Sequence, residues 1–328
     1  MKIQKRKSDH IDICLNRDVE LGGAGFEDVL LDHNALPELD LEKVDTSVRL
    51  FGKKLNAPII IEAMTGGSKE GKDINRDLAS VAEELGIGIG VGSQRAAIED
   101  DKVADTFSVV ADAAPKTLKI ANLGAVQLNY GYGVRECRKA VEMINADVLA
   151  LHLNPLQEAV QPEGDTNFSG LLPKISKVCN DLNKPVIAKE VGSGITLEVA
   201  KRLKKAGVKA IDIGGAGGTS WSLVEGYRAD SSLGIIFADW GIPTVECLLD
   251  LQPLKMPKIA SGGIRTGIDA AKALSLGADA VGIALPLLKA WKDKGKTGVE
   301  LYLNAFIREL RVSMFLTGSA DVKQLQRP

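Results

Sequence analysis

Residues 258–267 are Lys-Ile-Ala-Ser-Gly-Gly-Ile-Arg-Thr-Gly, a short apolar run followed by two adjacent glycines and the start of a helical pattern. Branched aliphatic residues favour a buried strand, and adjacent glycines permit a tight turn in which the backbone can approach a ligand closely. The next segment, residues 267–276, has apolar side chains at helical spacing and stops at Gly277. This stretch therefore predicts a strand, a turn and a helix in succession.

The same pattern recurs along the chain from about residue 57. Two further helical segments, residues 75–85 and 196–206, stop at Gly86 and Gly207. Strands separated by single helices predict right-handed crossovers and a parallel sheet, and eight such units match a closed barrel in size. We therefore predict an α/β fold, a TIM (β/α)₈ barrel. The expected strands are residues 58–63, 87–92, 118–122, 148–154, 186–191, 210–214, 258–261 and 280–284.

We expect the barrel, residues 57–296, to carry two flanking segments and no second domain. Residues 1–56 are an N-terminal extension that would contribute to the substrate site, and residues 297–328 are an extra C-terminal helix, expected over 297–318, and a tail. The longest connection, residues 215–241, is rich in aromatic side chains. Such a loop is often a lid or a subunit contact, and an ordered surface loop is the alternative.

The charge balance argues against nucleic acid and membranes as partners. Lys and Arg number 41 against 43 Asp and Glu, a formal net charge of −2, so any anion site must be local. No apolar run approaches the roughly 20 residues of a membrane helix, and the basic start leads into polar residues instead of a signal core. Cys14, Cys137, Cys179 and Cys247 form no C-x-x-C pair. Reduced, buried thiols are typical of a cytoplasmic protein, which we expect here.

Small, polar and charged residues gather at the ends of the expected strands, where the active site of a barrel lies. Gly262 and Gly263 precede a helix N-terminus in the loop after the seventh strand, a usual phosphate cradle of this fold. The loop 214–219 adds glycines and the hydroxyl of Thr219. Glycines that only make turns are the alternative. Neither loop contains the lysine of a P-loop, so hydrolysis of nucleoside triphosphates is not expected.

Lys189 stands out because it lies in an otherwise buried strand, residues 185–191. A buried lysine is costly unless an anionic or electron-rich group meets it. It could form a Schiff base, as in barrel aldolases, or face the N1/O2 edge of a flavin. A lysine whose ammonium reaches solvent at the barrel rim is the alternative.

Two further groups suit a diphosphate. His152 and Asn154 lie on one face of the fourth strand, and Glu158 follows closely; one carboxylate beside a diphosphate suits Mg²⁺. The segments 6–10 and 93–95 contribute Arg and Lys side chains, which suit a doubly charged phosphate group. A structural histidine and a solvated basic tail are the alternatives. From these residues alone, the prediction is a phosphate-binding barrel.

An ordered set of short motifs resembles the type 2 isopentenyl-diphosphate isomerases, which depend on flavin mononucleotide (FMN). The resemblance extends from residue 6 to about residue 317 and includes every strand end. Each motif is weak, but their order is specific. In one departure, Gly214 stands where several members have serine, which concerns one flavin hydrogen bond. The motifs are Arg6-Lys-x-Asp-His10, Ala63-Met-Thr-Gly-Gly67, Gly92-Ser-Gln-Arg95, Ala121-Asn-Leu-Gly124, His152-Leu-Asn-Pro-Leu-Gln-Glu158, Lys189-Glu-Val-Gly192, Gly217-Gly-Thr-Ser220 and Ala260-Ser-Gly-Gly-Ile-Arg265.

The resemblance implies a role for each position. The flavin ring would be lined by Ala63, Met64, Thr65, Ser93 and Asn122, with Lys189 near N1/O2. The ribityl phosphate would be held by Thr219, Gly263, Ile264, Arg265, Ala284 and Leu285. The substrate would be contacted by Arg6, Lys7, His10, Ser93, Gln94, Arg95 and Gln157. The catalytic group would be Gln157, Lys189, His152 and Asn154, and Glu158 would bind Mg²⁺.

The implied reaction interconverts isopentenyl and dimethylallyl diphosphate in isoprenoid biosynthesis, by proton addition and removal at reduced FMN without net redox change. Few side chains are placed to protonate an unactivated alkene, whereas reduced flavin exchanges protons at N5 and N1 and its electron-rich ring stabilises positive charge. NADPH would serve only to reduce the flavin. Members of the family form tetramers and octamers, so we expect a homotetramer or homooctamer.

Three other classes remain open at this point. An FMN-dependent oxidoreductase of the hydroxyacid-oxidase type shares the barrel and the phosphate cradle, but the cations at Arg6 and Lys7 suit a diphosphate better than a carboxylate. A Schiff-base aldolase would use Lys189 as its nucleophile. A flavin-binding protein without activity is the third, and the many polar groups at one barrel face argue against it.

Overall fold

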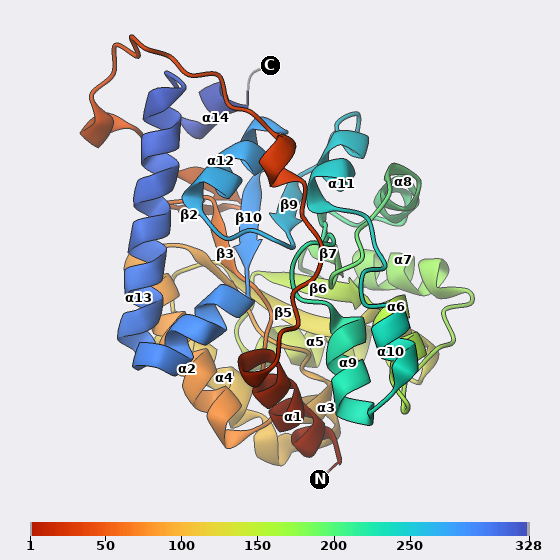
Figure 1. The fold of residues 1–328 in the computed structure, drawn as a ribbon. Coiled ribbons are helices and arrows are strands. Elements are labelled where there is room, and N and C mark those ends of the chain that lie inside the picture. Colours follow the sequence, from red (N-terminus) through yellow and green to blue (C-terminus); the bar gives the residue numbers. More distant parts are fainter. Residues whose placement is uncertain (1, 327–328) are drawn as a thin grey trace.

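Eight short strands close into a parallel barrel that is surrounded by helices (Figure 1). The computed structural model describes residues 2–326. Around the barrel the strand order is β10-β3-β4-β5-β6-β7-β8-β9, so each strand pairs with its neighbour in sequence and the last closes on the first. All eight expected strands are present, which confirms the predicted fold. They are β3 (Ile59–Ile61), β4 (Gly88–Gly90), β5 (Lys119–Gly124), β6 (Val148–Leu153), β7 (Val186–Glu190), β8 (Ala210–Asp212), β9 (Lys258–Ser261) and β10 (Ala280–Ile283).

The surrounding helices begin and end at local capping signals. α2 (Lys69–Leu85) starts at Ser68, whose hydroxyl accepts a hydrogen bond from Gly71 N–H, and ends at left-handed Gly86. It begins earlier than the expected residue 75 because Ser68 caps it. The other helices between strands are α3 (Arg95–Glu99), α4 (Asp105–Ala113), α5 (Val134–Met143), α6 (Pro155–Val160), α7 (Leu171–Asp181), α8 (Leu197–Lys205), α11 (Thr244–Asp250) and α12 (Gly267–Ser275).

Two segments are more helical than their sequence indicated. The connection 215–241 contains α9 (Trp221–Ala229) and α10 (Ser232–Ile236), and α9 packs against α6 and the N-terminal helix. The helix expected over 297–318 is the second half of α13 (Leu285–Leu316), which bends at Lys294 and Gly295 and packs on α2 and α12. The chain then enters α14 (Val322–Leu325). In the described part of the chain, no helix combines the length and the apolar character needed to cross a bilayer.

The N-terminal extension covers both ends of the barrel. α1 (Lys2–Asn16) packs on α9 and α13 near the carboxyl ends of the strands. The chain then continues along the outside of the barrel, shown in red and orange in Figure 1, through the short 3-10 helices η1 (Phe26–Asp28) and η2 (Leu41–Lys43). It ends in an antiparallel hairpin of β1 (Val48–Leu50) and β2 (Lys53–Leu55). Leu50 and Leu55 of this hairpin join the apolar core inside the barrel and close its amino-terminal end.

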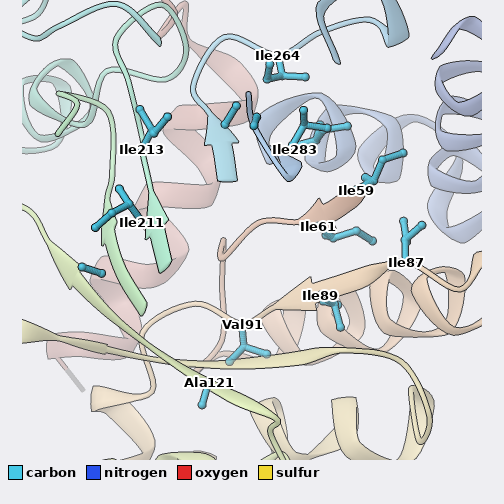
Figure 2. Packing of buried hydrophobic residues seen from close by; sticks show 14 of the residues in the cluster. Ile59, Ile61, Ile87, Ile89, Val91, Ala121, Ile211, Ile213, Ile264 and Ile283 are labelled. Carbon is cyan, nitrogen blue, oxygen red and sulfur yellow. The ribbon is translucent and has the colours of Figure 1, made fainter. Parts of the chain in front are cut away.

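Alternation along the strands divides the apolar residues between two cores. In β3, Ile59 and Ile61 belong to the outer core between strands and helices, whereas Ile60 belongs to the inner core of the barrel. Figure 2 shows part of the outer core, including Ile211 and Ile283. The inner core is small, so its contacts depend on a few fully buried side chains from the strands and the hairpin.

We predict that Leu55→Ala lowers the free energy of unfolding by about 2–5 kcal/mol, because it removes buried methyl groups and leaves a cavity in the inner core. Leu55 is 0% exposed. Urea unfolding followed by circular dichroism measures the change. The control is Leu301→Ala on α13, where the leucine is 58% exposed and the expected change is within about 0.5 kcal/mol. Equal midpoints for the two variants would contradict a closing role for the hairpin.

Candidate active site

The inside of the barrel changes from apolar to polar at a single layer of side chains. Inward positions recur at every second residue of a strand. Ile187 of β7 therefore lies in the inner core, and the next inward residue, Lys189, lies at the carboxyl end. The same step occurs from Ile60 to position 62, just beyond β3. We call this set the polar layer; it consists of Glu62, Asn122, His152, Lys189, Asp212 and Ser261.

A cavity lies at the carboxyl ends of the strands, and α1 forms part of its wall. All but one of the expected site residues line it. They are Arg6, Lys7, His10, Ala63, Met64, Thr65, Ser93, Arg95, Asn122, His152, Asn154, Gln157, Glu158, Lys189, Thr219, Gly263, Ile264, Arg265, Ala284 and Leu285.

Gln94 is the exception, and its expected contact with the substrate is not supported. Its side chain is fully buried behind the cavity wall. The amide Nε2 donates to the carbonyl of Ala140 at 2.8 Å, and Oε1 accepts from Asn122 N–H at 2.9 Å. Both ends of the amide are thus used to hold β5 and α5 together. Gln94 contributes to the site by holding Asn122 in position.

Lys189 is held between two carboxylates at the centre of the barrel. Its ammonium nitrogen lies 3.0 Å from Glu62 Oε2 and 3.0 Å from Asp212 Oδ2. Burial alone would lower the pKa of Lys189, but the carboxylates of Asp212 and Glu62 outweigh it and raise the pKa above its ordinary value. Burial, together with the charge of Glu62, raises the pKa of Asp212 to about 7. Lys189 is therefore a fixed cation. A Schiff-base lysine instead needs a lowered pKa, so this arrangement argues against an aldolase.

His152 is a neutral imidazole with a fixed orientation. Asn122 Nδ2 donates to the carbonyl of Val91 at 3.0 Å, which leaves Asn122 Oδ1 to accept from His152 Nδ1 at 2.8 Å. Nε2 then carries the lone pair. Burial, with the nearby charges of Lys7 and Lys189, lowers the pKa of His152 to about 3. The imidazole can therefore accept a hydrogen bond without adding positive charge to the cavity.

The basic N-terminal segment is not a solvated tail. Lys7 donates to the carbonyl of Ser93 at 3.3 Å, and His10 Nε2 lies 2.9 Å from Glu225 Oε1. His10 also packs edge-on against Trp221, with ring centroids 5.2 Å apart. Burial and the neighbouring guanidinium of Arg6 lower the pKa of Lys7 to about 8. Contacts with α9 therefore hold α1 over the cavity and aim its cations inward.

Amide and carboxyl groups form a connected wall on one side of the cavity. Asn154 Nδ2 donates to Gln157 Oε1 at 3.1 Å and to Glu158 Oε1 at 3.0 Å. Gln157 Nε2 donates in turn to Glu225 Oε1 at 3.2 Å. Burial raises the pKa of Glu158 despite a hydrogen bond from the backbone N–H of Asp165. Glu158 therefore sits where a cation would stabilise its ionised form.

Arg95 faces the cavity from the start of α3. Its guanidinium donates to Glu99 at 2.7 Å and to Asp165 at 2.5 Å, which fixes its direction. Gln127 donates to the same carboxylate at 2.9 Å. The loop that carries Asp165 thus links the cationic side of the cavity to Glu158.

Glycines allow close backbone approach on the opposite side of the cavity. Gly262 and Gly263 have φ values of +98° and +76°, and a Cβ at Gly218 would lie 2.7 Å from Gly263 N. Next to them α13 begins at Leu285 without a side-chain cap. Backbone N–H groups and a helix N-terminus together make a cradle for phosphate. Arg265 borders it and is paired with Glu20.

Comparison with known proteins places this barrel in a class. The chain matches the family model of FMN-dependent dehydrogenases over residues 140–328. A mandelate oxidase with a monooxide FMN adduct shares the fold at a TM-score of 0.66 and 18% identity, covering 100% of this chain and 98% of that one. A flavocytochrome b2 variant does so at 0.70 and 20%, covering 98% and 81%. These structures show the fold alone. The fold and the family model define a flavoprotein barrel of the FMN-dependent dehydrogenase class.

Sequence relatives define the family more narrowly. A protein from Nostoc sp. is 48% identical over 331 residues, 98% of this chain and 94% of its own length, and one from Archaeoglobus fulgidus is 49% identical over 330 residues, 99% and 95%. Both are named isopentenyl-diphosphate delta-isomerase. This chain belongs to the isopentenyl-diphosphate delta-isomerase family.

The cavity fits FMN on structural grounds of its own. Among the described residues, four buried side-chain atoms lack a hydrogen-bond partner, and three of them, Glu62 Oε1, Thr65 Oγ1 and Asn154 Oδ1, belong to residues that line this cavity. Buried polar atoms without partners are rare, so their concentration here indicates room for a polar ligand. The close backbone approach at the glycine cradle leaves space that suits a phosphate group. For a metal, no group of three or more His, Cys, Asp or Glu side chains gathers in the described chain. A cation would depend on few protein ligands.

Sequence reasoning missed three charged members of the site. Glu62 and Asp212 interrupt buried apolar strands in the same way as Lys189, so the argument applied to the lysine would have found them. Glu225, with a side chain 0% exposed, lies on α9 within the connection expected as a loop, and nothing in its local sequence marks it. Only the packing of α9 on α1 reveals it.

We predict that Gly263→Ala weakens FMN binding at least tenfold. A Cβ at this position would lie 2.4 Å from Ala24 Cβ and 2.8 Å from Gly217 O, so the cradle must deform. Quenching of flavin fluorescence on titration of the apoprotein measures the affinity. The matched control is Gly277→Ala, which also has positive φ (+93°) but meets no atom closer than 4.0 Å. It carries the backbone strain alone and should bind FMN normally. Equal affinities would contradict the assignment of the cradle.

Proposed function

We propose that this chain interconverts isopentenyl diphosphate and dimethylallyl diphosphate with reduced FMN, without net oxidation. The observation that carries the proposal is the presence of two anion sites in one cavity. The glycine cradle and the start of α13 suit the FMN phosphate, and the cations of Arg6, Lys7 and Arg95 across the cavity suit a diphosphate. The names of the relatives from Nostoc sp. and Archaeoglobus fulgidus support the same substrate pair.

The chain's own residues would hold FMN along the polar layer. Lys189 would face the N1/O2 edge of the ring, because it is the fixed cation at the centre of the barrel. The phosphate would rest on the cradle. The ring and the phosphate would be bordered by residues that line the cavity, namely Ala63, Met64, Thr65, Ser93, Asn122, Thr219, Gly263, Ile264, Arg265, Ala284 and Leu285. When bound, reduced FMN supplies exchangeable protons at N5 and N1 and an electron-rich ring.

The protein side of the mechanism is binding, orientation and the exclusion of competing charge. Arg6, Lys7 and Arg95 neutralise the diphosphate, which anchors the five-carbon unit with its double bond inside the cavity. His152 stays neutral because its pKa is lowered to about 3, so it does not repel positive charge that develops on the substrate. Gln157, fixed between Asn154 and Glu225, presents its amide at the cavity wall and orients the carbon skeleton.

We further propose that Glu158 would supply one ligand to Mg²⁺, which would help to neutralise the charge of the diphosphate. Magnesium in such sites is typically bound by one or two carboxylates together with phosphate oxygens and water. The raised pKa of buried Glu158 supports this, since a cation would compensate for its desolvation. NADPH is proposed only as the reductant of the flavin, and isoprenoid biosynthesis as the pathway.

The proposal also covers assembly and location. We propose a cytoplasmic homotetramer or homooctamer. The free thiols of the chain support a reducing compartment. Ile236, the last residue of α10, is 68% exposed, and Trp240, four residues further on, is 64% exposed; they support a subunit contact there.

The decisive test is turnover in D₂O with chemically reduced enzyme and Mg²⁺. We predict that deuterium enters the dimethylallyl product while the bleached flavin spectrum persists and no reductant is consumed per turnover. Product analysis by NMR and the flavin absorbance measure both quantities. Reductant consumption in proportion to product would contradict isomerisation without net redox change. Oxidation of a 2-hydroxy acid with reduction of the flavin would instead indicate a hydroxyacid-oxidase type of oxidoreductase.

The pH profile tests the diphosphate site. Lys7, with a pKa of about 8, is a cation below that pH and loses its charge above it. Since kcat/KM reports the free enzyme, we predict that it falls above about pH 8 as Lys7 deprotonates. Lys7→Arg retains the charge to much higher pH and should lose this limb of the profile. An alkaline limb unchanged in Lys7→Arg would show that another group is responsible.

A further inference from the structure

Three charged side chains from three strands meet beneath the cavity. Glu62 follows β3, Lys189 ends β7 and Asp212 ends β8, and all are buried, with exposed fractions of 6%, 8% and 2%. Both carboxylates contact the same ammonium at 3.0 Å. We call these three residues the charge triad. One carboxylate would suffice to pair one lysine, so the second needs an explanation, because an excess charge is costly to bury.

The triad is open on the side of the cavity. The second oxygen of Asp212, Oδ1, accepts a hydrogen bond from Ser261 Oγ at 2.5 Å. Glu62 Oε1, by contrast, is buried without a partner among the described residues, and Glu62 lines the cavity. Room for Glu62 is provided by Gly282, where a Cβ would lie 2.2 Å from Glu62 Oε1. The absence of a side chain at Gly282 on β10 thus leaves space for a second carboxylate at the barrel centre.

We propose that Glu62 and Asp212 are positioning residues that hold the ammonium of Lys189 at the flavin ring and, by their negative charge, keep the reduction potential of bound FMN low. This inference rests on the proposed placement of Lys189 against the N1/O2 edge. A low potential corresponds to an electron-rich reduced ring, which is the property that protonation of an alkene requires. Without the two carboxylates, the ammonium of Lys189 would raise the reduction potential of bound FMN.

The direction of the expected change in reduction potential follows from electrostatics. Two-electron reduction adds negative charge to the ring, so a nearby cation favours reduction and a nearby anion opposes it. In a site with little water these interactions are weakly screened. Removing one carboxylate leaves the ammonium less compensated, so reduction becomes easier. Removing the ammonium leaves two carboxylates, so reduction becomes harder.

The experiment measures the midpoint potential of bound FMN in reductive titrations against a reference dye. Glu62→Gln and Asp212→Asn keep side-chain shape and remove one carboxylate each. The titrations are run at about pH 9, above the raised pKa of Asp212, so that each substitution removes one charge. In both variants we expect the reduction equilibrium of bound FMN to shift at least tenfold toward the reduced form. For a two-electron couple this raises the midpoint potential by about 30 mV. Lys189→Met should lower it. Glu62→Asp keeps the charge and should remain close to the wild type.

The matched control is Asp279→Asn at the other end of the barrel. Asp279 also accepts a hydrogen bond from a strand N–H, that of Lys258 at 2.8 Å, but it lies away from the cavity. The midpoint potential of FMN bound to the Asp279→Asn variant should equal that of the wild type. If Asp212→Asn fails to fold, Glu62→Gln decides. Ser261→Ala is a milder variant that removes the hydrogen bond to Asp212 Oδ1, together with the one that Ser261 Oγ accepts from Gly214 N–H, and it should shift the potential in the same direction.

Wild-type potentials in both Glu62→Gln and Asp212→Asn, with FMN bound, would overturn the proposal. Failure of the proposed function is a separate result: it would appear as absence of dimethylallyl product with the wild-type enzyme, whatever the potentials of the variants. A structural role alone predicts lower thermal stability without a shift in potential. A shift in the predicted direction, absent from Asp279→Asn, supports the charge triad as the device that sets the potential.

Discussion

The arrangement of the active site depends on one buried ammonium. Lys189 can lie at the centre of the barrel only because Glu62 and Asp212 meet it there at 3.0 Å. An isolated charge at this depth would cost several kcal/mol, and loss of both carboxylates would leave the ammonium uncompensated. The barrel meets this constraint by geometry, since inward positions of different strands converge on its axis. The layer just below is apolar, with Ile60 and Ile187, so the change of polarity occurs within one step of two residues along each strand.

The N-terminal extension contributes residues to both the apolar end and the polar end of the barrel. Its hairpin adds Leu50 and Leu55 to the inner core, which excludes water from the apolar end. Its first helix, α1, brings Arg6 and Lys7 over the polar end, where contacts of His10 with Glu225 and Trp221 hold it. One segment thus contributes to stability at one end and to recognition at the other. The cationic side chains and the glycine cradle line the same cavity, so the proposed sites for a diphosphate and for the cofactor phosphate share one space.

Burial sets the protonation of the remaining groups. His152 is kept neutral by desolvation and by the cations around it, while its hydrogen bond to Asn122 selects the tautomer. The amide–carboxyl wall from Glu158 through Asn154 and Gln157 to Glu225 is connected by direct hydrogen bonds between 3.0 and 3.2 Å. Few free acids or bases therefore line this part of the cavity, which agrees with the proposal that reduced FMN exchanges the protons while the protein contributes orientation and charge.

The fold and much of the site were determined by local sequence. Strand runs, glycine turns and helix caps such as Ser68 and Gly86 act over a few residues, so their pattern alone predicted the barrel and the positions of Lys189 and Gly263. Contacts between distant segments were decided only by tertiary structure. Gln94 follows a strand end as a ligand-binding residue would, yet the packing of α5 turns its amide into the protein. Glu225 lies 215 residues from His10 in sequence, and only the docking of α1 on α9 brings them within 2.9 Å. Local patterns carry no information on such pairings, because the free energy that selects them comes from burial between elements that the chain brings together on folding.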